Sequence, residues 1–340
     1  MSRLVDGYDL VVFDLDGVVY LIDRPILGAA EAVERLRADG TPVAFATNNA
    51  SRRAADVAAL LSGMGVPARP DEVLTSAGAS AALLARDLPA GAPVLVVGAD
   101  ALRDEVRDAG LTVVETFEDG PAAVVQGYGP DVGWRILAEA ALSVRAGARW
   151  VATNTDRTLP SPRGPLPGNG SLVSVLRTAL DREPDTVVGK PQPALFTTAA
   201  EQAAAKRPLT VGDRLDTDIE GAVAAGMDSM LVLTGVSGPA DLLSAPPERR
   251  PTYVAADVSG LFEAPVRLAP AEETGGEQPT GAGQLTGGES GGWRLTGDGA
   301  LDGDGDPIDA LRLLCPAAWS GTRPTAASEP ARNLLKSWGL

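Results

Sequence analysis

The 340-residue sequence contains no histidine and only one cysteine, Cys315. Histidine-based catalytic triads, phosphohistidine intermediates and histidine-ligated zinc are therefore excluded, and an internal disulfide cannot form. Chemistry in this chain has to rest on carboxylates, hydroxyls, amides and a few cations. Hard oxygen ligands of this kind favour Mg²⁺ over zinc, and the low cysteine content is typical of a protein of the reducing cytoplasm.

Long apolar runs and an excess of positive charge are also missing. No run approaches the roughly 18 apolar residues needed to cross a bilayer, and residues 1–10 lack the pattern of a secretion signal. The formal net charge is −16, which argues against nucleic acid or an anionic membrane surface as the main partner. An anionic ligand would need a local countercharge, and a metal ion is the obvious source.

Short apolar runs alternate with Ala/Leu/Arg-rich segments of helical period along most of the chain. Four runs are apolar on both faces, which is the pattern of central strands in a parallel sheet covered by helices; they lie at 10–13, 42–47, 186–189 and 209–212. Amphipathic segments between them end at Gly40 and Gly65, as helices commonly do. The sequence therefore predicts an α/β fold with a doubly wound parallel sheet.

A second strand–helix series lies inside the first and predicts an inserted α/β domain at residues 80–186. Its expected strands lie at 94–98, 111–115, 122–129 and 149–154, and its expected helices near 133–146 and 171–182. The main domain then comprises 1–79 and 187–265. Residues 266–292 are rich in Gly, Thr and Glu, which is typical of a flexible linker. Residues 293–340 form a small C-terminal accessory segment.

Polar residues follow each of the predicted strands of the main domain. Ligands of open α/β sheets bind at the carboxyl ends of the strands, and the residues at these ends are Asp14 and Asp16, Thr47 and Asn48, Gly189 and Lys190, and Asp213 and Asp218. Each group alone has a simpler explanation. DLDG could be an acidic turn, Ser51 could cap a helix beginning near Arg52, and GDRLDTD could be a solvated loop before a helix at 218–225. Lysine occurs only at positions 190, 206 and 336, and Lys190 could simply lie on the surface. These separate explanations would all have to apply by chance at the same edge of one sheet. A single functional site at that edge is therefore the better explanation.

This set of residue types fits phosphoryl transfer. A carboxylate beside Mg²⁺ can attack phosphorus and form an aspartyl-phosphate, while a second carboxyl protonates the leaving oxygen and later deprotonates the attacking water. A threonine hydroxyl, backbone amides at a helix N-terminus and a lysine can hold the phosphoryl oxygens. The metal and the lysine also offset the repulsion between an anionic substrate and several aspartates.

The stretches DLDGV, TNN, GKP and GDRLDTD, in this order, resemble the motifs of the haloacid dehalogenase-like phosphohydrolases. Residues 152–176, ATNTDRTLPSPRGPLPGNGSLVSVL, look like part of the large α/β cap of the NagD-type branch, which includes nitrophenylphosphatases, phosphoglycolate phosphatases and pyridoxal phosphatases. The resemblance covers residues 8–265. It implies a Rossmann-like core, a cap that selects the substrate at 80–186, and an active Mg²⁺-dependent phosphatase, because no motif position departs from the pattern.

The resemblance also implies roles for individual residues. Asp14 would be the nucleophile and Asp16 the general acid and base. Mg²⁺ would be held by Asp14, the backbone carbonyl of Asp16 and Asp213, with Asp218 in support. The residues expected to bind the phosphoryl group are Thr47, Asn48 and Lys190; the cap residues expected near the leaving group are Asn154, Asp156, Arg157, Thr158 and Leu159. For Thr158 and Leu159, simple packing within the cap is as good an explanation as a position near the leaving group.

A GC-rich composition, the Gly-rich linker and the extra C-terminal segment resemble the actinobacterial glycerol-3-phosphate phosphatases. We therefore expect glycerol 3-phosphate as the substrate, with 2-phosphoglycolate, nitrophenyl phosphate and nucleotide monophosphates as alternatives. The lack of a cap histidine weakens the case for pyridoxal phosphate. The expected enzyme is cytoplasmic and acts on a small phosphorylated metabolite without a nucleic-acid or membrane partner, and a homodimer through the cap is left open.

Two other classes use similar residues. A phospho-acceptor signalling domain also places Asp, Thr and Lys at strand ends, but its acceptor would not lie on the first strand. A phosphomutase usually carries a helical cap after the first motif, whereas the insertion here follows Thr47. Residues 301–309, LDGDGDPID, do not fit a calcium loop of the EF-hand type, because its sixth and twelfth positions would be Pro307 and Leu313. They predict an acidic turn before a helix at 307–318.

Overall fold

The structure is a computed structural model that describes residues 2–22, 24–268 and 288–340. Its largest sheet has six parallel strands in the order β15-β14-β13-β1-β4-β5. In that order they are Tyr253–Ala255, Asp228–Val232, Pro208–Gly212, Leu10–Phe13, Val43–Thr47 and Val73–Thr75. The predicted strands at 10–13, 42–47 and 209–212 are confirmed, and β1 lies in the centre between β13 and β4. This sheet forms the core unit.

Both faces of the core sheet are covered by helices, because successive side chains of each strand point to opposite faces. Val11 and Phe13 pack toward α1 (Ala29–Ala38) and α2 (Ala54–Gly63). Leu10 and Val12 pack toward α7 (Ala194–Gln202) on the other face. The predicted helix at 218–225 is a π turn, η4 (Leu215–Ile219), that continues into α8 (Glu220–Ala224). The remaining elements of this unit are α9 (Pro239–Leu243), the hairpin strands β2 (Tyr20–Leu21) and β3 (Arg24–Pro25), and the short 3-10 turns η1 (Leu4–Gly7), η2 (Pro70–Glu72), η5 (Pro247–Arg249) and η6 (Val258–Phe262).

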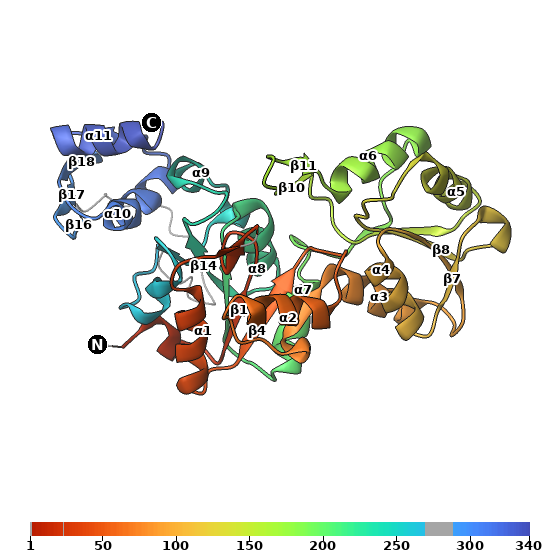
Figure 1. The fold of residues 1–340 in the computed structure, drawn as a ribbon. Coiled ribbons are helices and arrows are strands. Elements are labelled where there is room, and N and C mark those ends of the chain that lie inside the picture. The colour runs from red at the N-terminus through yellow and green to blue at the C-terminus, as the bar shows by residue number, and fades with distance from the viewer. Residues whose placement is uncertain (1, 23, 269–287) are drawn as a thin grey trace, which may run out of the picture.

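A second parallel sheet lies beside the core unit, inserted between β5 and β13 (Figure 1). Its strand order is β12-β9-β8-β6-β7, that is Thr186–Val187, Arg149–Ala152, Ala123–Gln126, Pro93–Val97 and Thr112–Val114. Helices α3 (Ser76–Asp87) and α4 (Asp100–Asp108) cover one face, and α5 (Trp134–Arg145) and α6 (Asn169–Leu180) cover the other. The 3-10 turn η3 (Phe117–Asp119) and the hairpin of β10 (Thr158–Leu159) and β11 (Leu166–Pro167) complete this cap unit.

The prediction that residues 186–189 form a strand of the core sheet is wrong. These residues contribute β12, which pairs in parallel with β9 at the edge of the cap sheet. A short run that is apolar on both faces fits either of two parallel sheets, and only tertiary packing selects between them. The expected domain limits both fall inside elements of the cap unit, since 79/80 lies within α3 and 186/187 divides β12.

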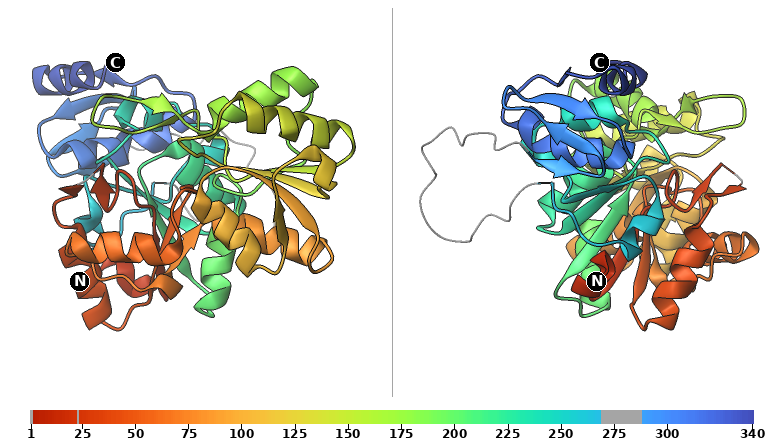
Figure 2. Two further views of the ribbon diagram at one scale, coloured as in Figure 1. Left: turned by 45° about the vertical axis from the view of Figure 1, so that its right-hand side comes forward. Right: turned by 90° about the vertical axis from the view of Figure 1, so that its left-hand side faces the viewer.

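The C-terminal segment folds as a small unit against the core, at the far end of the molecule from α5 (Figures 1 and 2). Its sheet has the order β16-β17-β18-β19, Glu289–Ser290, Trp293–Leu295, Ala300–Gly303 and Thr325–Ala326, and its helices are α10 (Pro307–Trp319) and α11 (Glu329–Ser337). The helix predicted at 307–318 is confirmed as α10. Its N-cap is Asp306, whose side chain accepts a hydrogen bond from the N–H of Ile308 at 2.7 Å.

The expected linker at 266–292 is too long at both ends. Residues 269–287 lie outside the described residues, but Leu268 is buried in an apolar cluster and β16 begins at 289. Among the described parts of the chain, no helix is both long and apolar enough to span a membrane.

Candidate active site

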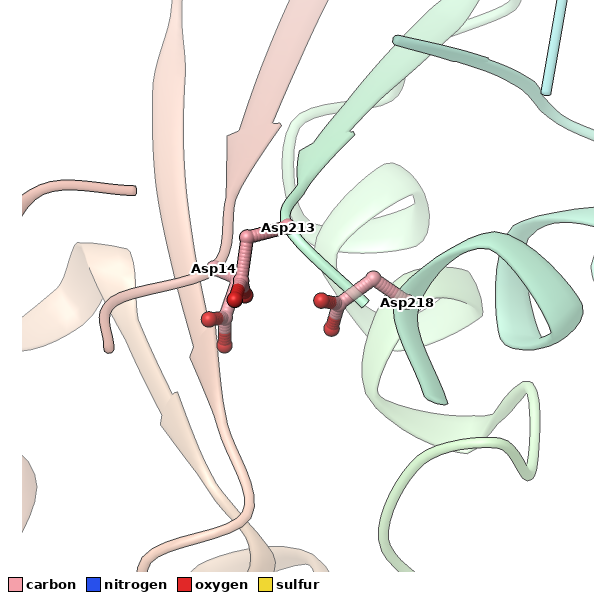
Figure 3. A group of neighbouring side chains, drawn as sticks. All are labelled: Asp14, Asp213 and Asp218. Carbon is pink, nitrogen blue, oxygen red and sulfur yellow. The ribbon is translucent and has the colours of Figure 1, made fainter. Parts of the chain in front are cut away.

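Three aspartates meet at the carboxyl ends of the central core strands (Figure 3). Asp14 follows β1, Asp213 follows β13, and Asp218 lies on the π turn η4. One carboxylate oxygen from each lies within 4.8 Å of the others, and all three residues are buried. The structure thus brings together three of the predicted metal ligands. Asp16, two residues beyond Asp14, is partly buried at the rim of this cluster.

The position of Asp213 depends on two glycines. Gly17 has a φ of +88°, and a Cβ added there would lie 2.5 Å from Asp213 Oδ2. A Cβ added to Gly235 would lie 2.0 Å from the same oxygen. Side chains at either position would displace the carboxylate, so the first motif needs its glycine for close approach as well as for backbone conformation.

The Asp213 carboxylate has a donor on only one oxygen. Its Oδ2 accepts a hydrogen bond from the N–H of Val236 at 2.7 Å, whereas the buried Oδ1 has no hydrogen-bond partner among the described residues. Burial, followed by the nearby Asp218 carboxylate, raises the pKa of Asp213 to about 7. A buried, unpartnered carboxylate oxygen is costly, and a hard divalent cation would supply the missing interaction. This donor set therefore fits Mg²⁺.

Lys190 lies at the floor of the site, as predicted, although the strand before it belongs to the cap sheet. Its buried ammonium donates to Asp14 Oδ1, to Asp218 Oδ1 at 2.7 Å and to the carbonyl of Ala46 at 3.0 Å. Burial acts to lower the pKa of Lys190, but Asp14 and Asp218 raise it above its ordinary value, so the ammonium is charged. Burial and Asp218 raise the pKa of Asp14, and Lys190 opposes this rise.

Asn48 connects the core unit to the cap unit through its side-chain amide. Its Oδ1 accepts from the N–H of Lys190 at 2.7 Å, and its Nδ2 donates to the Lys190 carbonyl at 3.0 Å and to the Asp156 carboxylate at 3.1 Å. The Nδ2 of Asn154 donates to the carbonyl of Asn48 at 2.7 Å. Both amide side chains are thus engaged by the protein itself. The sequence interpretation did not anticipate this use for residues that it expected to contact substrate.

Thr47 and Ser51 flank this amide on the core side. Thr47 is buried, and its hydroxyl oxygen accepts from the N–H of Asn49 at 3.1 Å. The alternative that Ser51 caps a helix beginning near Arg52 is wrong, because α2 begins at Ala54 with Arg53 in the N-cap position. Ser51 instead donates its N–H and its hydroxyl to Asn49 Oδ1, both at 2.8 Å, and thereby fixes the loop after β4.

A pocket of about 390 Å³ opens above the aspartates between the core and cap units. Sequence-predicted residues that line it are Asp14, Asp16, Thr47, Asn48, Asn154, Asp156, Thr158, Leu159, Lys190 and Asp218. Two predicted residues are not part of its lining: Asp213 is fully buried, and Arg157 is exposed. Lining residues that the sequence interpretation missed include Tyr20, Arg52, Tyr128, Asn169, Arg214 and Thr217. Adjacency to the first, second and fourth motifs could have indicated Tyr20, Arg52, Arg214 and Thr217.

Asp16 faces this pocket between groups of opposite charge. Burial raises the pKa of Asp16, while Lys190, Arg52 and a hydrogen bond with Tyr20 oppose the rise and Asp156 adds to it. Arg214 is held by Asp216 at 2.9 and 3.0 Å. Among the described residues no carboxylate pairs with Arg52, the other arginine of the lining. Its guanidinium is therefore available to a ligand.

Two stretches of the chain match models of related hydrolases. Residues 11–112 match the haloacid dehalogenase-like hydrolase model and residues 187–261 match a HAD-hydrolase-like model, while residues 290–340 match a GCN5-related N-acetyltransferase like domain.

Named relatives match the whole chain or about three quarters of it. D-glycerol 3-phosphate phosphatase from Mycobacterium tuberculosis is 44% identical over 352 residues, covering 100% of this chain and 96% of the relative. A crystal structure of glycerol phosphate phosphatase from the same organism in complex with magnesium has a TM-score of 0.87 at 43% identity and covers 99% of both chains. The 4-nitrophenylphosphatase from Thermotoga maritima has a TM-score of 0.71 at 31% identity, over 76% of this chain and 98% of that one.

Proposed function

The chain belongs to the haloacid dehalogenase-like hydrolases, and on this basis we propose that it hydrolyses glycerol 3-phosphate to glycerol and phosphate. It is a Mg²⁺-dependent phosphoric monoester hydrolase. The observation that carries the reaction class is the buried cluster of Asp14, Asp213 and Asp218 with Lys190 at the floor of a pocket. The substrate rests on the relative from M. tuberculosis, which spans the whole chain.

In the proposed reaction, a carboxylate oxygen of Asp14 attacks the phosphorus atom, and the bond between phosphorus and the glycerol oxygen breaks. Asp16 gives its proton to the departing oxygen, then removes a proton from the water that hydrolyses the aspartyl-phosphate. Lys190 and Thr47 hold phosphoryl oxygens. Asp14, Asp213, Asp218 and the backbone carbonyl of Asp16 would hold Mg²⁺, which would offset the negative charge of the substrate and the carboxylates.

The raised pKa of Asp16 supports its assignment as the acid. A carboxyl group that donates a proton must carry one in the bound state, and burial favours the neutral form. Tyr20, which lines the same pocket, opposes part of the rise in the pKa of Asp16.

The polar side chains on two sides of the pocket favour a substrate whose leaving group carries hydroxyls. Arg52 from the core and Asp156 from the cap both act electrostatically on Asp16, so they flank the place where the leaving oxygen is protonated. Glycerol hydroxyls can donate to Asp156 and accept from Arg52. The carboxylate of 2-phosphoglycolate would approach the like charge of Asp156, which makes that alternative less favourable.

The size of the pocket also supports a small substrate. A volume of about 390 Å³ lies near the lower end of the range for ligand sites in proteins. Leu159 and Thr158, on the β10–β11 hairpin, line the cap side of the pocket. A volume of this size suits a three-carbon polyol phosphate better than a nucleotide. Nitrophenyl phosphate remains the alternative substrate that relatives support by name.

Three further assignments belong to this proposal. Residues 80–186 act as the substrate-selecting cap. The enzyme works in the cytoplasm, which the lone buried Cys315 supports. A homodimer through the cap is the third assignment, and the exposed Trp134 at the start of α5 is a residue that such an interface would cover.

The proposal is tested with purified protein and Mg²⁺ against glycerol 3-phosphate, 2-phosphoglycolate, nitrophenyl phosphate and nucleotide monophosphates, with Asp14→Asn as the control. We expect the highest kcat/KM for glycerol 3-phosphate and a loss of more than about a thousandfold in the variant. Absence of phosphate release from every compound, or full activity in Asp14→Asn, would overturn the reaction class. A preference for another compound would overturn the substrate.

A further inference from the structure

The C-terminal unit and the core unit share one buried apolar cluster. On the C-terminal side it contains Trp293, Leu311 and Leu314, and on the core side it contains Leu242 of α9 together with two residues of the π turn that carries Asp218, namely Leu215 and Ile219. The nitrophenylphosphatase from T. maritima covers 76% of this chain and 98% of its own, and residues 290–340 match a family model separate from the hydrolase models, so the C-terminal unit is an addition to the hydrolase units.

The segment between β14 and α9 holds Asp213 through its backbone. The N–H of Val236 donates to the Asp213 carboxylate at 2.7 Å, and the N–H of Ser237 donates to the Asp213 carbonyl at 3.0 Å. The hydroxyl of Ser237 in turn accepts from the N–H of Leu215 at 3.0 Å. Residues 236 and 237 therefore fix both Asp213 and the start of the turn that carries Asp218.

This segment leads directly into the N-terminal end of α9, and the C-terminal unit contacts the C-terminal end of the same helix. The indole N–H of Trp319, the last residue of α10, donates to the carbonyl of Leu242 at 2.9 Å. Helix α9 has only five residues, Pro239–Leu243, and a helix of this length is not stable without tertiary contacts. The carbonyl of Leu242 also accepts from the N–H of Ala245 at 3.2 Å, so the indole is a second donor to it.

Arg250, on the core side, also contacts Trp319. Its guanidinium lies over the Trp319 ring at 5.1 Å from the centroid and donates to the Trp319 carbonyl at 3.3 Å. The same side chain donates through Nε to the carbonyl of Ala245, just beyond α9, at 3.1 Å. Trp319 is thus held on the core at the end of α9 by three contacts, two of them from Arg250.

We propose that the C-terminal unit positions the metal site: Trp319 fixes α9 and, through the segment at 236–238, keeps Asp213 in the geometry that binds Mg²⁺. The inference rests on the proposed function only for the identity of the ion. It assigns the C-terminal unit a role in metal affinity rather than a separate reaction. Trp319 is a positioning residue, since its indole touches α9 and not the pocket.

The test compares two tryptophan-to-phenylalanine variants of the full-length protein. Trp319→Phe removes the indole donor that holds α9. The matched control is Trp293→Phe, which removes an indole donor within the C-terminal unit, where Trp293 Nε1 donates to the carbonyl of Asp306 at 2.9 Å. Mg²⁺ affinity is measured by titration calorimetry, the melting temperature without metal reports stability, and kcat is measured at saturating Mg²⁺.

We expect Trp319→Phe to bind Mg²⁺ about three- to tenfold more weakly, the effect of one lost buried hydrogen bond, with kcat restored at saturating Mg²⁺. Trp293→Phe should lose stability and keep its Mg²⁺ affinity. Unchanged affinity in Trp319→Phe, or equal weakening in both variants, would overturn the inference. If Trp319→Phe does not fold, Arg250→Gln takes its place with the same expected results. If the protein released phosphate from no compound, the proposed function would fail, while the difference in Mg²⁺ affinity would still decide this inference.

Discussion

The side-chain oxygen of Asn48 accepts a hydrogen bond from the backbone N–H of Lys190 at 2.7 Å, although the two residues are 142 positions apart in the chain. Asn48 follows a central strand of the core, and Lys190 lies where the chain returns from the cap. The amide nitrogen of Asn48 also reaches Asp156 of the cap. The Asn48 side chain therefore fixes Lys190, at the floor of the pocket, and Asp156, at its wall, relative to each other.

Replacing Asn48 with Ala should destabilise the protein and impair catalysis together. The change leaves the Lys190 backbone and the Asp156 carboxylate without their partner, which costs about 1–3 kcal/mol for each buried group left unsatisfied. Urea-induced unfolding measures the stability, and kcat/KM for glycerol 3-phosphate measures the activity. Asn49→Ala is the matched control: Asn49 also lines the pocket, but within the described part of the chain its side chain bonds only to Ser51 in its own loop. Equal activity in the two variants would contradict the role of Asn48.

Replacing Asp16 with Asn should affect substrates according to their leaving groups. Glycerol is a poor leaving group that needs a proton in the transition state, so the loss with glycerol 3-phosphate should be about 10²- to 10⁴-fold. Nitrophenolate departs without protonation, and its loss should be much smaller. Steady-state rates with both substrates at one pH make the comparison. Equal losses would remove Asp16 from the acid role.

Replacing Arg52 with Gln should weaken recognition of the leaving group. We expect kcat/KM for glycerol 3-phosphate to fall about tenfold, the value of one charge-assisted hydrogen bond, while inhibition by inorganic phosphate changes little. The neighbouring Arg53→Gln is the control, because Arg53 pairs with Glu105 and Asp108 on α4. A matching loss of phosphate inhibition in Arg52→Gln would place the guanidinium at the phosphoryl group instead.

Stabilisation by Mg²⁺ should increase with pH. The pKa of Asp213 is about 7 in the folded, metal-free chain, against an ordinary value of 3.8. The folded state thus holds this proton more tightly than the unfolded chain does, and the metal-free protein loses the corresponding stability as pH rises from about 4 through 7. Mg²⁺ binds the ionised form of this carboxylate, so bound metal removes the loss of stability that ionisation of Asp213 causes in the metal-free protein. The rise in melting temperature between EDTA and saturating Mg²⁺ should therefore be larger at about pH 8 than at about pH 5.5. An equal or smaller rise at the higher pH would contradict the assignment.

The sequence was sufficient for the parts of the fold that repeat a regular pattern. The two-sided apolar runs predicted β1, β4 and β13, and motif residues at their ends predicted the carboxylate cluster of Asp14, Asp213 and Asp218. These predictions hold because strand period and the location of strand ends are local properties that the side chains determine directly.

Properties that depend on partners from distant parts of the chain could not be predicted. Residues 186–187 carry the apolar pattern of a core strand and pair with β9 in the cap. Asn48 carries the pattern of a phosphate ligand, and its side chain is occupied by Lys190 and Asp156. Tyr128 and Asn169 line the pocket only because the cap lies over the core. No short-range signal marks such residues.

The pairing of β1 with β13, a strand that follows the whole cap in the sequence, limits when the enzyme can become active during its synthesis. The first strand can pair with β4 early, but its other edge remains open until the entire cap has been translated. The cap strands, which end at Val187, can fold while that edge of β1 is still unpaired. No nascent chain that ends before Asp218 contains the complete carboxylate cluster. A ribosome-bound chain shorter than this is therefore inert, and catalysis requires translation at least through the fourth motif.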